Sequence, residues 1–242
     1  MAHKITLIPG DGIGPEVVSA ATRCIEATGI KVSWDEVIAG QTALDKYSQV
    51  LPDSVLESIK MNRVALKGPI ITPIGEGFRS VNVAIRQALN LYACVRPVKT
   101  YVGVNTPYKN VDLVVIRENS EDLYAGIEFE EGKLETREII LKIEEYTDKK
   151  IRLDSGISLK PISKSASERI ARFAFEYAIK YNRKKVTIVH KANIMKFTDG
   201  LFLKIARQTA ADYMNKVAFE EAIGDTMARQ VVQKPQSYDV LL

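Results

Sequence analysis

The segment Lys4-Ile-Thr-Leu-Ile-Pro-Gly-Asp-Gly-Ile-Gly-Pro-Glu16 predicts a strand, a tight turn and the first turn of a helix. Lys4–Ile8 is rich in β-branched residues, and three glycines within the next six residues interrupt the strand. Pro15 is tolerated in a first helical turn, where a backbone N–H has no partner to lose. Apolar side chains then recur at helical spacing, at Val17, Val18, Ala21, Cys24 and Ile25.

The same order of strand and helix continues along the chain. Further strands are expected at Lys31–Ile38, Arg63–Leu66, Val111–Ile116, Lys185–His190 and Val217–Ala222. Further helices are expected at Pro52–Met61, Asp199–Met214 and Asp225–Val232, and at the capping box Ser165-Ala-Ser-Glu168. Strands that alternate with helices indicate an α/β fold with a mainly parallel sheet.

Changes in composition divide the chain into three parts. We interpret residues 1–91 as the N-terminal part of a large domain, and residues 92–121 with 165–242 as a small domain. Residues 122–164 are charged and interrupted by glycine, with short alternating segments at Lys150–Leu153 and Gly156–Leu159. This inserted α+β arm is too polar to bury a core alone, so we expect it to pair with a second copy in a homodimer.

The chain closes with Tyr238-Asp-Val-Leu-Leu242, which has the pattern of a strand buried on both faces. Such a strand needs covering elements on both sides, and we expect them to be missing. The interpretation is that the large domain is incomplete and the chain truncated.

Composition excludes several classes of function. Hydrophobic residues make up 46% of the 242 residues, charged residues make up 26%, and the net charge is +4. This weak, dispersed positive charge suits an acidic small molecule better than a nucleic acid. No apolar run reaches the ~18 residues of a membrane span, and two cysteines with two histidines argue against a Cys/His zinc site. The N-terminus carries no signal peptide, so a cytoplasmic protein is expected.

Gly10-Asp-Gly-Ile-Gly14 resembles a dinucleotide-binding turn but lacks its spacing. A Rossmann fingerprint has the order Gly-x-Gly-x-x-Gly, and Pro15 stands where its third glycine would be. No acidic residue stands out about 20 residues further on to hold a ribose. The simpler interpretation, a tight turn that requires positive φ, is favoured.

Ser80, Asn82 and Arg86 lie at the start of another predicted helix. Asn82 and Arg86 are four residues apart and therefore project from one face. A hydroxyl, an amide and a guanidinium at a helix N-terminus form a ready anion site, and Ser80 also qualifies as the helix cap. For Arg86 taken alone, a solvated surface arginine is the more common outcome.

Two further arginines lie near expected strands. Arg96 precedes Pro97 at an expected strand start, and Arg117 follows the apolar run Val111–Ile116. An unpaired charge at the mouth of a buried strand is costly, so Arg117 requires a partner. That partner is either the adjacent Glu118, in a structural ion pair, or a ligand with several carboxylates, which arginine forks bind in a bidentate manner.

Several motifs, in order, resemble those of the isocitrate-type, metal-dependent β-decarboxylating dehydrogenases. They are Ile8-Pro-Gly-Asp-Gly-Ile-Gly-Pro-Glu16, Ser80-x-Asn-x-x-x-Arg86, Arg96-Pro97, Arg117-Glu-Asn-Ser-Glu-Asp-x-Tyr-Ala-Gly126 and Val189-His-Lys-Ala-Asn-Ile-Met-Lys-Phe-Thr-Asp-Gly200. The resemblance covers the whole chain and implies an α/β, isopropylmalate/isocitrate dehydrogenase-like, non-Rossmann fold. It also implies a substrate clamp made of Ser80, Asn82, Arg86, Arg96 and Arg117.

The resemblance assigns roles to five more residues. It implies that Tyr124 and Lys191 carry protons, that Thr72 and Asn193 bind the cofactor, and that Asp225 is a metal-binding aspartate. Lys191 and Asp225 would be offered across a homodimer interface. Taken alone, Tyr124 is more often a core or interface residue, Lys191 a solvated strand end and Asp225 a helix N-cap.

The implied reaction is oxidation of isocitrate at C2 by hydride transfer to NAD or NADP, followed by loss of CO₂ to give 2-oxoglutarate. Mg²⁺ or Mn²⁺ would lower the pKa of the C2 hydroxyl. The N-terminal half is more similar to the NAD-type enzymes. Homoisocitrate or tartrate oxidation is one alternative, and a non-catalytic subunit that binds citrate-like anions is another. Family members carry further metal-binding aspartates and an adenosine-binding loop beyond the matched region, so we expect this chain alone to be inactive.

Overall fold

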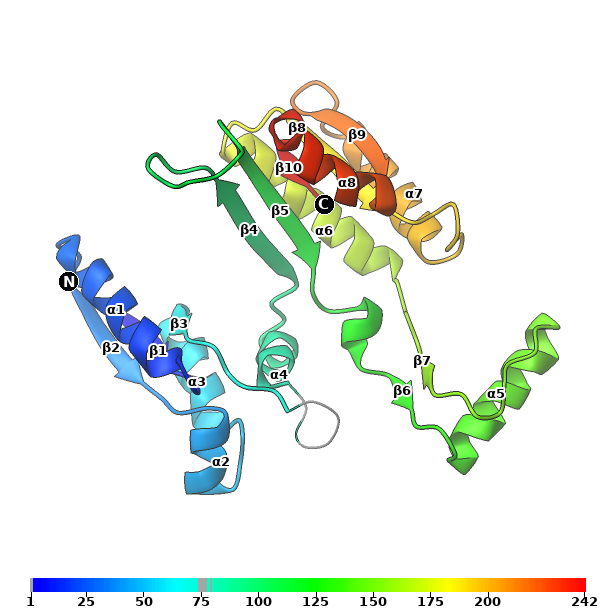
Figure 1. Cartoon of the computed structure of the whole chain (residues 1–242), viewed down its shortest axis with the longest axis horizontal. Coiled ribbons are helices and arrows are strands. Elements are labelled where there is room, and N and C mark those ends of the chain that lie inside the picture. Colours follow the sequence, from blue (N-terminus) through cyan, green and yellow to red (C-terminus); the bar gives the residue numbers. More distant parts are fainter. Residues whose placement is uncertain (1, 74–77, 79) are drawn as a thin grey trace. The chain divides into compact units, whose positions relative to one another are not determined.

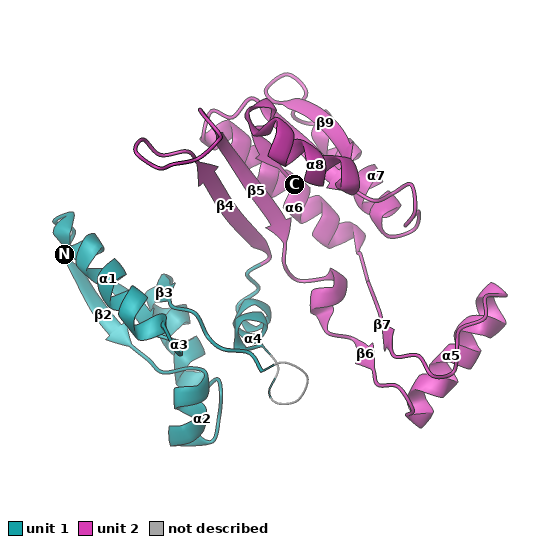
Figure 2. Cartoon of the chain, in the orientation of Figure 1, with its two compact units in different colours: residues 1–91 teal, residues 92–242 magenta. Residues whose placement is uncertain are grey.

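The computed structural model describes residues 2–73, 78 and 80–242. The chain forms two compact units, Met1–Leu91 (unit 1) and Tyr92–Leu242 (unit 2), which Figure 2 shows in different colours. Both units combine parallel strands with helices, which confirms the predicted α/β class. Within the described residues, no helix is both long enough and apolar enough to cross a membrane.

Unit 1 is built on three parallel strands in the order β2-β1-β3. Their bounds are His3–Ile8 for β1, Val32–Glu36 for β2 and Ala65–Lys67 for β3. The helices are α1 (Gly14–Ala27), α2 (Gln41–Tyr47), α3 (Asp53–Asn62) and α4 (Val81–Ala88). The core of the unit is formed by Ile8, Ala39, Val55, Ile70, Val81 and Ile85.

The sequence does not predict helix α2, because its cap comes from a distant turn. The N-cap position is Gly40, which has no side chain to accept a hydrogen bond. The buried Asp11 carboxylate takes that role and accepts from Gln41 N at 3.0 Å. It also accepts from Ile71 N at 3.2 Å. One side chain in the turn after β1 therefore satisfies backbone donors of two other segments.

The glycines after β1 serve close packing of backbone against backbone. Gly10 has φ +83°, and a Cβ there would lie 2.0 Å from Pro69 O. A Cβ on Gly68 would lie 2.1 Å from Pro9 O. The two segments therefore pass each other at a distance that only glycine allows. Turn geometry accounts for these glycines, as the simpler interpretation of the motif predicts.

Unit 2 contains a five-stranded sheet in the order β4-β5-β10-β8-β9. Strand β4 is antiparallel to β5, and all the other neighbours are parallel. The strands are Ala93–Lys99 (β4), Asp112–Glu118 (β5), Lys185–His190 (β8), Ala218–Ile223 (β9) and Val240–Leu241 (β10). The ends of β5, β8 and β9 therefore meet along one side of the sheet, here called the carboxyl edge.

Helices cover both faces of this sheet (Figure 1). Helices α6 (Lys164–Lys180) and α7 (Asp199–Ala211) share one buried cluster with Val114 of β5. Helix α8 (Gly224–Gln233) joins Leu113 of the same strand in a second cluster through Met227. Successive residues of β5 thus enter opposite cores, as expected for a strand buried on both faces.

The final strand is covered, so the expectation that it lacks covering elements is wrong. Strand β10 pairs in parallel with β5 and β8 at the centre of the sheet. Val240 is buried in the cluster with α6 and α7, and Leu241 is buried in the cluster with α8. Elements that precede the strand in sequence supply the cover on both faces.

Residues 122–164 combine short strands with one helix. The elements are a 3₁₀ turn η1 (Asp122–Ala125), β6 (Glu128–Phe129), α5 (Leu134–Thr147) and β7 (Ile157–Ser158). Strand β7 lies within the predicted segment Gly156–Leu159 and pairs antiparallel with β6. The strand-like interpretation of Lys150–Leu153 is wrong. Its Ile151 N–H donates to Glu144 Oε1 at 2.7 Å, which ties the segment to α5 instead of to a strand.

The capping box assigned to Ser165-Ala-Ser-Glu168 is also wrong, by two residues. Helix α6 begins at Lys164, and Ser163 occupies the N-cap position in an extended conformation. The Ser163 hydroxyl accepts from Ala166 N at 3.1 Å. A serine thus caps the helix as predicted, but a different serine from the one chosen.

Candidate functional site

The carboxyl edge of unit 2 brings two predicted site residues together. Lys191 directly follows β8, and Asp225 lies in the first turn of α8, directly after β9. The Lys191 ammonium donates a hydrogen bond to the Asp225 carboxylate, and this bond lowers the pKa of Asp225 below its usual 3.8. Asp225 is not the helix N-cap, because that position is Ile223. The Asp225 side chain is 70% exposed, so the pair is open to a ligand.

Arg117 does not pair with its neighbour Glu118. Adjacent residues of β5 point to opposite faces of the sheet. Glu118 accepts from Ser120 N at 2.7 Å and lies 3.9 Å from the Arg169 guanidinium. Arg117 instead donates to Asn119 Oδ1 at 2.8 Å. The alternative of a structural Arg117–Glu118 ion pair is therefore wrong.

Arg117 and Tyr124 lie together at the end of β5. The Arg117 Cζ stands 4.8 Å from the centre of the Tyr124 ring, within the range of a cation–π contact. Arg117 Nε is buried and has no hydrogen-bond partner among the described residues. A buried donor of this kind normally has a partner, so the guanidinium retains capacity to bind an acceptor.

Arg96 lies within β4, and its expected position at a strand start is wrong. β4 begins at Ala93, and Pro97 is accommodated because β4 is an edge strand of the described sheet. The register pairs Arg96 with Val115 and Cys94 with Arg117. Residues directly opposite each other share a face, so Arg96 and Arg117 lie on the same face of the sheet.

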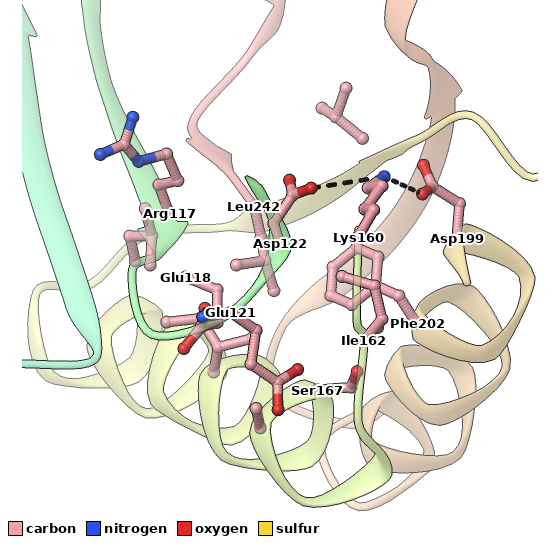
Figure 3. A pocket seen from close by; sticks show the side chains of 14 residues that line it. Arg117, Glu118, Glu121, Asp122, Lys160, Ile162, Ser167, Asp199, Phe202 and Leu242 are labelled. Carbon is pink, nitrogen blue, oxygen red and sulfur yellow. Dashed lines mark hydrogen bonds and ion pairs between the residues drawn. The ribbon is translucent and has the colours of Figure 1, made fainter. Parts of the chain in front are cut away.

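A cavity of about 200 Å³ lies at the carboxyl edge (Figure 3). Charged side chains line part of it, namely Arg117, Glu118, Glu121, Asp122, Lys160 and Asp199. Lys160 stands between Asp122 and Asp199, with its ammonium 2.6 Å from Asp199 Oδ1. The sequence does not single out these three residues, because a lysine and two aspartates in separate loops follow no local pattern.

Three predicted clamp residues belong to unit 1. Ser80 occupies the N-cap position of α4, as predicted, but its side chain makes no capping hydrogen bond. Asn82 Oδ1 is buried and meets no partner within the part of the chain that the structure describes. Arg86 lies on the same helix and acts on Lys67, whose pKa is lowered by burial first and by the charge of Arg86 second. From the sequence, no role is assigned to Lys67, the last residue of β3.

The predicted cofactor residues lie in different units, and the predicted metal residue, Asp225, lies in unit 2. Thr72 lies in unit 1 and Asn193 in the loop after β8 of unit 2, and both are exposed. Across residues 2–73, 78 and 80–242, no three His, Cys, Asp or Glu side chains are grouped to hold a metal ion. Asp225 therefore offers a single carboxylate, whereas Mg²⁺ or Mn²⁺ usually needs more oxygen ligands.

The chain is similar to known dehydrogenases along its whole length. Residues 4–242 match the isocitrate/isopropylmalate dehydrogenase family. An isocitrate dehydrogenase (NADP) from Archaeoglobus fulgidus is 43% identical over 98% of this chain, and one from Staphylococcus aureus is 40% identical over 98%. The crystal structure of isocitrate dehydrogenase from Methylococcus capsulatus superposes with a TM-score of 0.87 at 49% identity and covers 99% of this chain.

These relatives are longer than this chain. It spans 64% of the Archaeoglobus fulgidus protein, 67% of the Staphylococcus aureus protein and 66% of the Methylococcus capsulatus chain. The matched segment nevertheless includes every residue of the predicted clamp and both predicted proton carriers. The chain belongs to the isocitrate/isopropylmalate dehydrogenase family.

Proposed function

We propose that this chain supplies the substrate-binding and proton-transferring groups of an NADP-dependent isocitrate dehydrogenase. The observation that carries the proposal is the arrangement of Arg117, Tyr124, Lys191 and Asp225 at the ends of strands of one sheet. Ligands of open α/β sheets bind outside the carboxyl ends of the strands. The relatives that act on isocitrate support the choice of substrate.

The proposed clamp suits a tricarboxylate. Arg96 and Arg117 share a face of the unit 2 sheet, and Arg117 Nε lacks a protein partner among the described residues. In unit 1, Arg86 and Lys67 add two positive charges near each other. Arginine forks bind carboxylates through paired, charge-assisted hydrogen bonds. We propose that Ser80 and Asn82 complete this clamp and distinguish isocitrate from an alkyl-substituted analogue.

Lys191 and Tyr124 are proposed to move protons. Lys191 of one chain would assist removal of the proton from the C2 hydroxyl in the site of the second chain, and Tyr124 would return a proton at C3 after CO₂ is lost. The contact between Lys191 and Asp225 supports the first role, because a carboxylate holds the ammonium at the strand end. The Arg117 guanidinium over the Tyr124 ring supports the second, because it places a cation beside the phenol.

NADP is the proposed hydride acceptor. The relatives from Archaeoglobus fulgidus and Staphylococcus aureus are both NADP enzymes, so the preference for NAD finds no support. When bound, the nicotinamide would accept the hydride from C2. Thr72 and Asn193 are proposed to contact the cofactor.

We further propose that the 242-residue chain alone has no appreciable turnover. It supplies one candidate metal carboxylate, Asp225, and the described residues contain no larger cluster of metal-binding side chains. A divalent ion held by one carboxylate would polarise the hydroxyl poorly. The complete protein would use Mg²⁺ or Mn²⁺, with ligands from outside this segment.

Residues 122–164 are proposed to hold a homodimer together. Helix α5 leaves Leu134 69% exposed and Leu141 50% exposed, and their spacing of seven residues places them on one face. Tyr146 at the end of the same helix is 73% exposed. An apolar helix face of this kind is stabilised by pairing with a second copy.

Calorimetry with isocitrate and 3-isopropylmalate tests the proposed clamp in the chain itself. We expect isocitrate to bind more tightly, and Arg117→Ala to weaken its binding by about 1.5–3 kcal/mol through loss of a charge-assisted contact. Arg207→Ala is the matched control, because Arg207 pairs with Glu221 on the surface. Equal affinity for the two ligands, or an unchanged affinity for isocitrate in Arg117→Ala, would contradict the proposed clamp.

A further inference from the structure

Lys160 lies between two carboxylates from different segments of unit 2 (Figure 3). Its ammonium is 2.6 Å from Asp199 Oδ1 and 3.9 Å from Asp122 Oδ1. The Lys160 side chain is 24% exposed and that of Asp199 is 13% exposed. The pair is therefore shielded from much of the solvent screening that weakens ion pairs on the surface.

Asp199 connects Lys160 to the loop that carries Lys191. It is the first residue of α7, and its second oxygen, Oδ2, accepts the Lys191 backbone N–H at 2.7 Å. One carboxylate thus holds the backbone of Lys191 with one oxygen and the ammonium of Lys160 with the other. The Lys160 ammonium also lies 3.5 Å from Met195 Sδ, inside the loop between Lys191 and Asp199.

Asp122 connects Lys160 to the turn that carries Tyr124. It begins the 3₁₀ turn η1 with φ +65°, a conformation that is uncommon outside glycine. Its N–H donates to Pro161 O at 3.1 Å, which ties the start of the turn to the residue after Lys160. Asp122 Oδ1 is buried and forms no hydrogen bond within the described residues, so the nearby lysine is its charge partner.

We propose that Lys160 is a positioning residue that holds the Tyr124 turn and the Lys191 loop of one chain in fixed register through Asp122 and Asp199. The assignment rests on the proposed function, since it concerns the two groups that would carry protons. Loss of the Lys160 ammonium leaves the Asp199 carboxylate, which is 13% exposed, and the buried Oδ1 of Asp122 without their shared cation. Asp199 is then no longer held by Lys160, so the Lys191 loop, whose backbone N–H binds Asp199, is held less firmly. Groups that act in catalysis tolerate only small displacements.

The pKa of Asp225, measured by carbon NMR on the 242-residue chain, reports the position of Lys191 without any need for turnover. The Lys191 ammonium lowers this pKa. We expect Lys160→Met to raise it toward 3.8, in the same direction as Lys191→Met. Lys160→Arg should keep it low, because a guanidinium can still pair with Asp199. Asp199→Asn should raise it, because a neutral amide has one acceptor oxygen where the carboxylate uses two, one for Lys160 and one for the Lys191 N–H.

Lys185→Met is the matched control. Lys185 lies at the other end of β8, and its ammonium pairs with Glu220 at 2.7 Å and lowers the pKa of that carboxyl. This substitution should raise the pKa of Glu220 and leave that of Asp225 unchanged. An Asp225 pKa that shifts in Lys191→Met but not in Lys160→Met would overturn the proposal.

A kinetic comparison tests the consequence for catalysis in the chain extended to the length of its relatives. Lys160→Met should lower kcat for isocitrate by up to about 100-fold and change KM little, because the reacting groups are misplaced while the clamp remains. Lys160→Arg should restore most of the rate. An unchanged kcat in Lys160→Met would overturn the positioning role even if the Asp225 pKa moves. If the proposed function is wrong, the unsubstituted long chain will not turn over isocitrate. The NMR comparison then tests only whether Lys160 holds the Tyr124 turn and the Lys191 loop in register.

Discussion

Lys191 and Asp225 are 34 residues apart in the sequence and form an ion pair at the carboxyl edge of the unit 2 sheet. Their meeting follows from the parallel register of β8 and β9, which sets His190 opposite Ile223. Lys191, just after β8, and Asp225, just after β9, therefore lie next to each other. Neither residue would meet the other if the two strands were antiparallel or shifted by several residues.

The pKa of Asp225 should depend on Lys191. Because a hydrogen bond from the ammonium lowers this pKa, Lys191→Met should raise it toward 3.8. The pair stabilises the fold at pH values above 3.8, and this contribution is lost as the pH falls through the lowered pKa of Asp225. An NMR titration of the carboxyl carbon measures the shift. A pKa that is the same in both proteins would contradict the ion pair.

Arg183 should stabilise unit 2 by joining β10 to its neighbours. Its guanidinium donates to Asp112 Oδ1 at 2.7 Å and to Asp239 Oδ1 at 3.1 Å, and its side chain is 18% exposed. Arg183→Leu should therefore lower the free energy of unfolding by about 1.5–3 kcal/mol, as measured by urea denaturation. The Arg183 hydrogen bond lowers the pKa of Asp112, so the difference should shrink as the pH falls below 3.8.

Arg207→Leu is the control for that comparison. Arg207 also makes a double contact, to both carboxylate oxygens of Glu221, but its side chain is 58% exposed. An exposed pair of this kind is worth about 0–1 kcal/mol. A loss in Arg183→Leu no larger than that in Arg207→Leu would show that β10 does not depend on Arg183.

Gly10 should tolerate alanine far less well than Gly29 does. Both residues have similar positive φ values, +83° and +82°. A Cβ on Gly10 would lie 2.0 Å from Pro69 O, whereas a Cβ on Gly29 meets no atom within 4 Å. Gly29→Ala should lower the free energy of unfolding by about 1–2 kcal/mol, because alanine is strained in the left-handed conformation. Gly10→Ala should cost clearly more, and equal losses in thermal unfolding would refute the close backbone packing.

A single charge on the exposed face of α5 should prevent the proposed homodimer. Leu141 is 50% exposed and lies on the same helix face as Leu134. Leu141→Glu would bury a charge if that face pairs with a second copy, which is strongly unfavourable. Sedimentation velocity at micromolar concentration should then show a monomer. The control, Met61→Glu at a 70% exposed position of α3, should remain a dimer, and a monomeric unsubstituted chain would contradict the proposal.

The sequence predicts most of the strands and helices of this fold because their signals are local. The bounds of β8, Lys185–His190, are predicted without error from a local run of β-branched residues, Val186 to Val189. Features that depend on distant partners are missed. Asp11 caps α2 from 30 residues away, and the cover on β10 comes from helices that precede it in sequence.

In the candidate site too, local patterns predict some residues, and contacts with distant segments are missed. Arg117 and Lys191 stand at the ends of strands and Asp225 stands at the start of a helix, where the sequence places them. The contact of Arg117 with Asn119 is not predicted, although the alternation of side chains along a strand already places Arg117 and Glu118 on opposite faces. Lys160 is missed because its role depends on two loops that approach it only in the folded chain.

Reduction of NADP by isocitrate, followed by absorbance in the presence of Mn²⁺, tests the central claim most directly. The protein measured is this chain extended to the length of its relatives, beside its Lys191→Met variant and with 3-isopropylmalate as the competing substrate. The account predicts turnover that depends on isocitrate, is at least about 100-fold slower with 3-isopropylmalate, and is lost in Lys191→Met. Equal rates with the two substrates, or full activity in Lys191→Met, would contradict it.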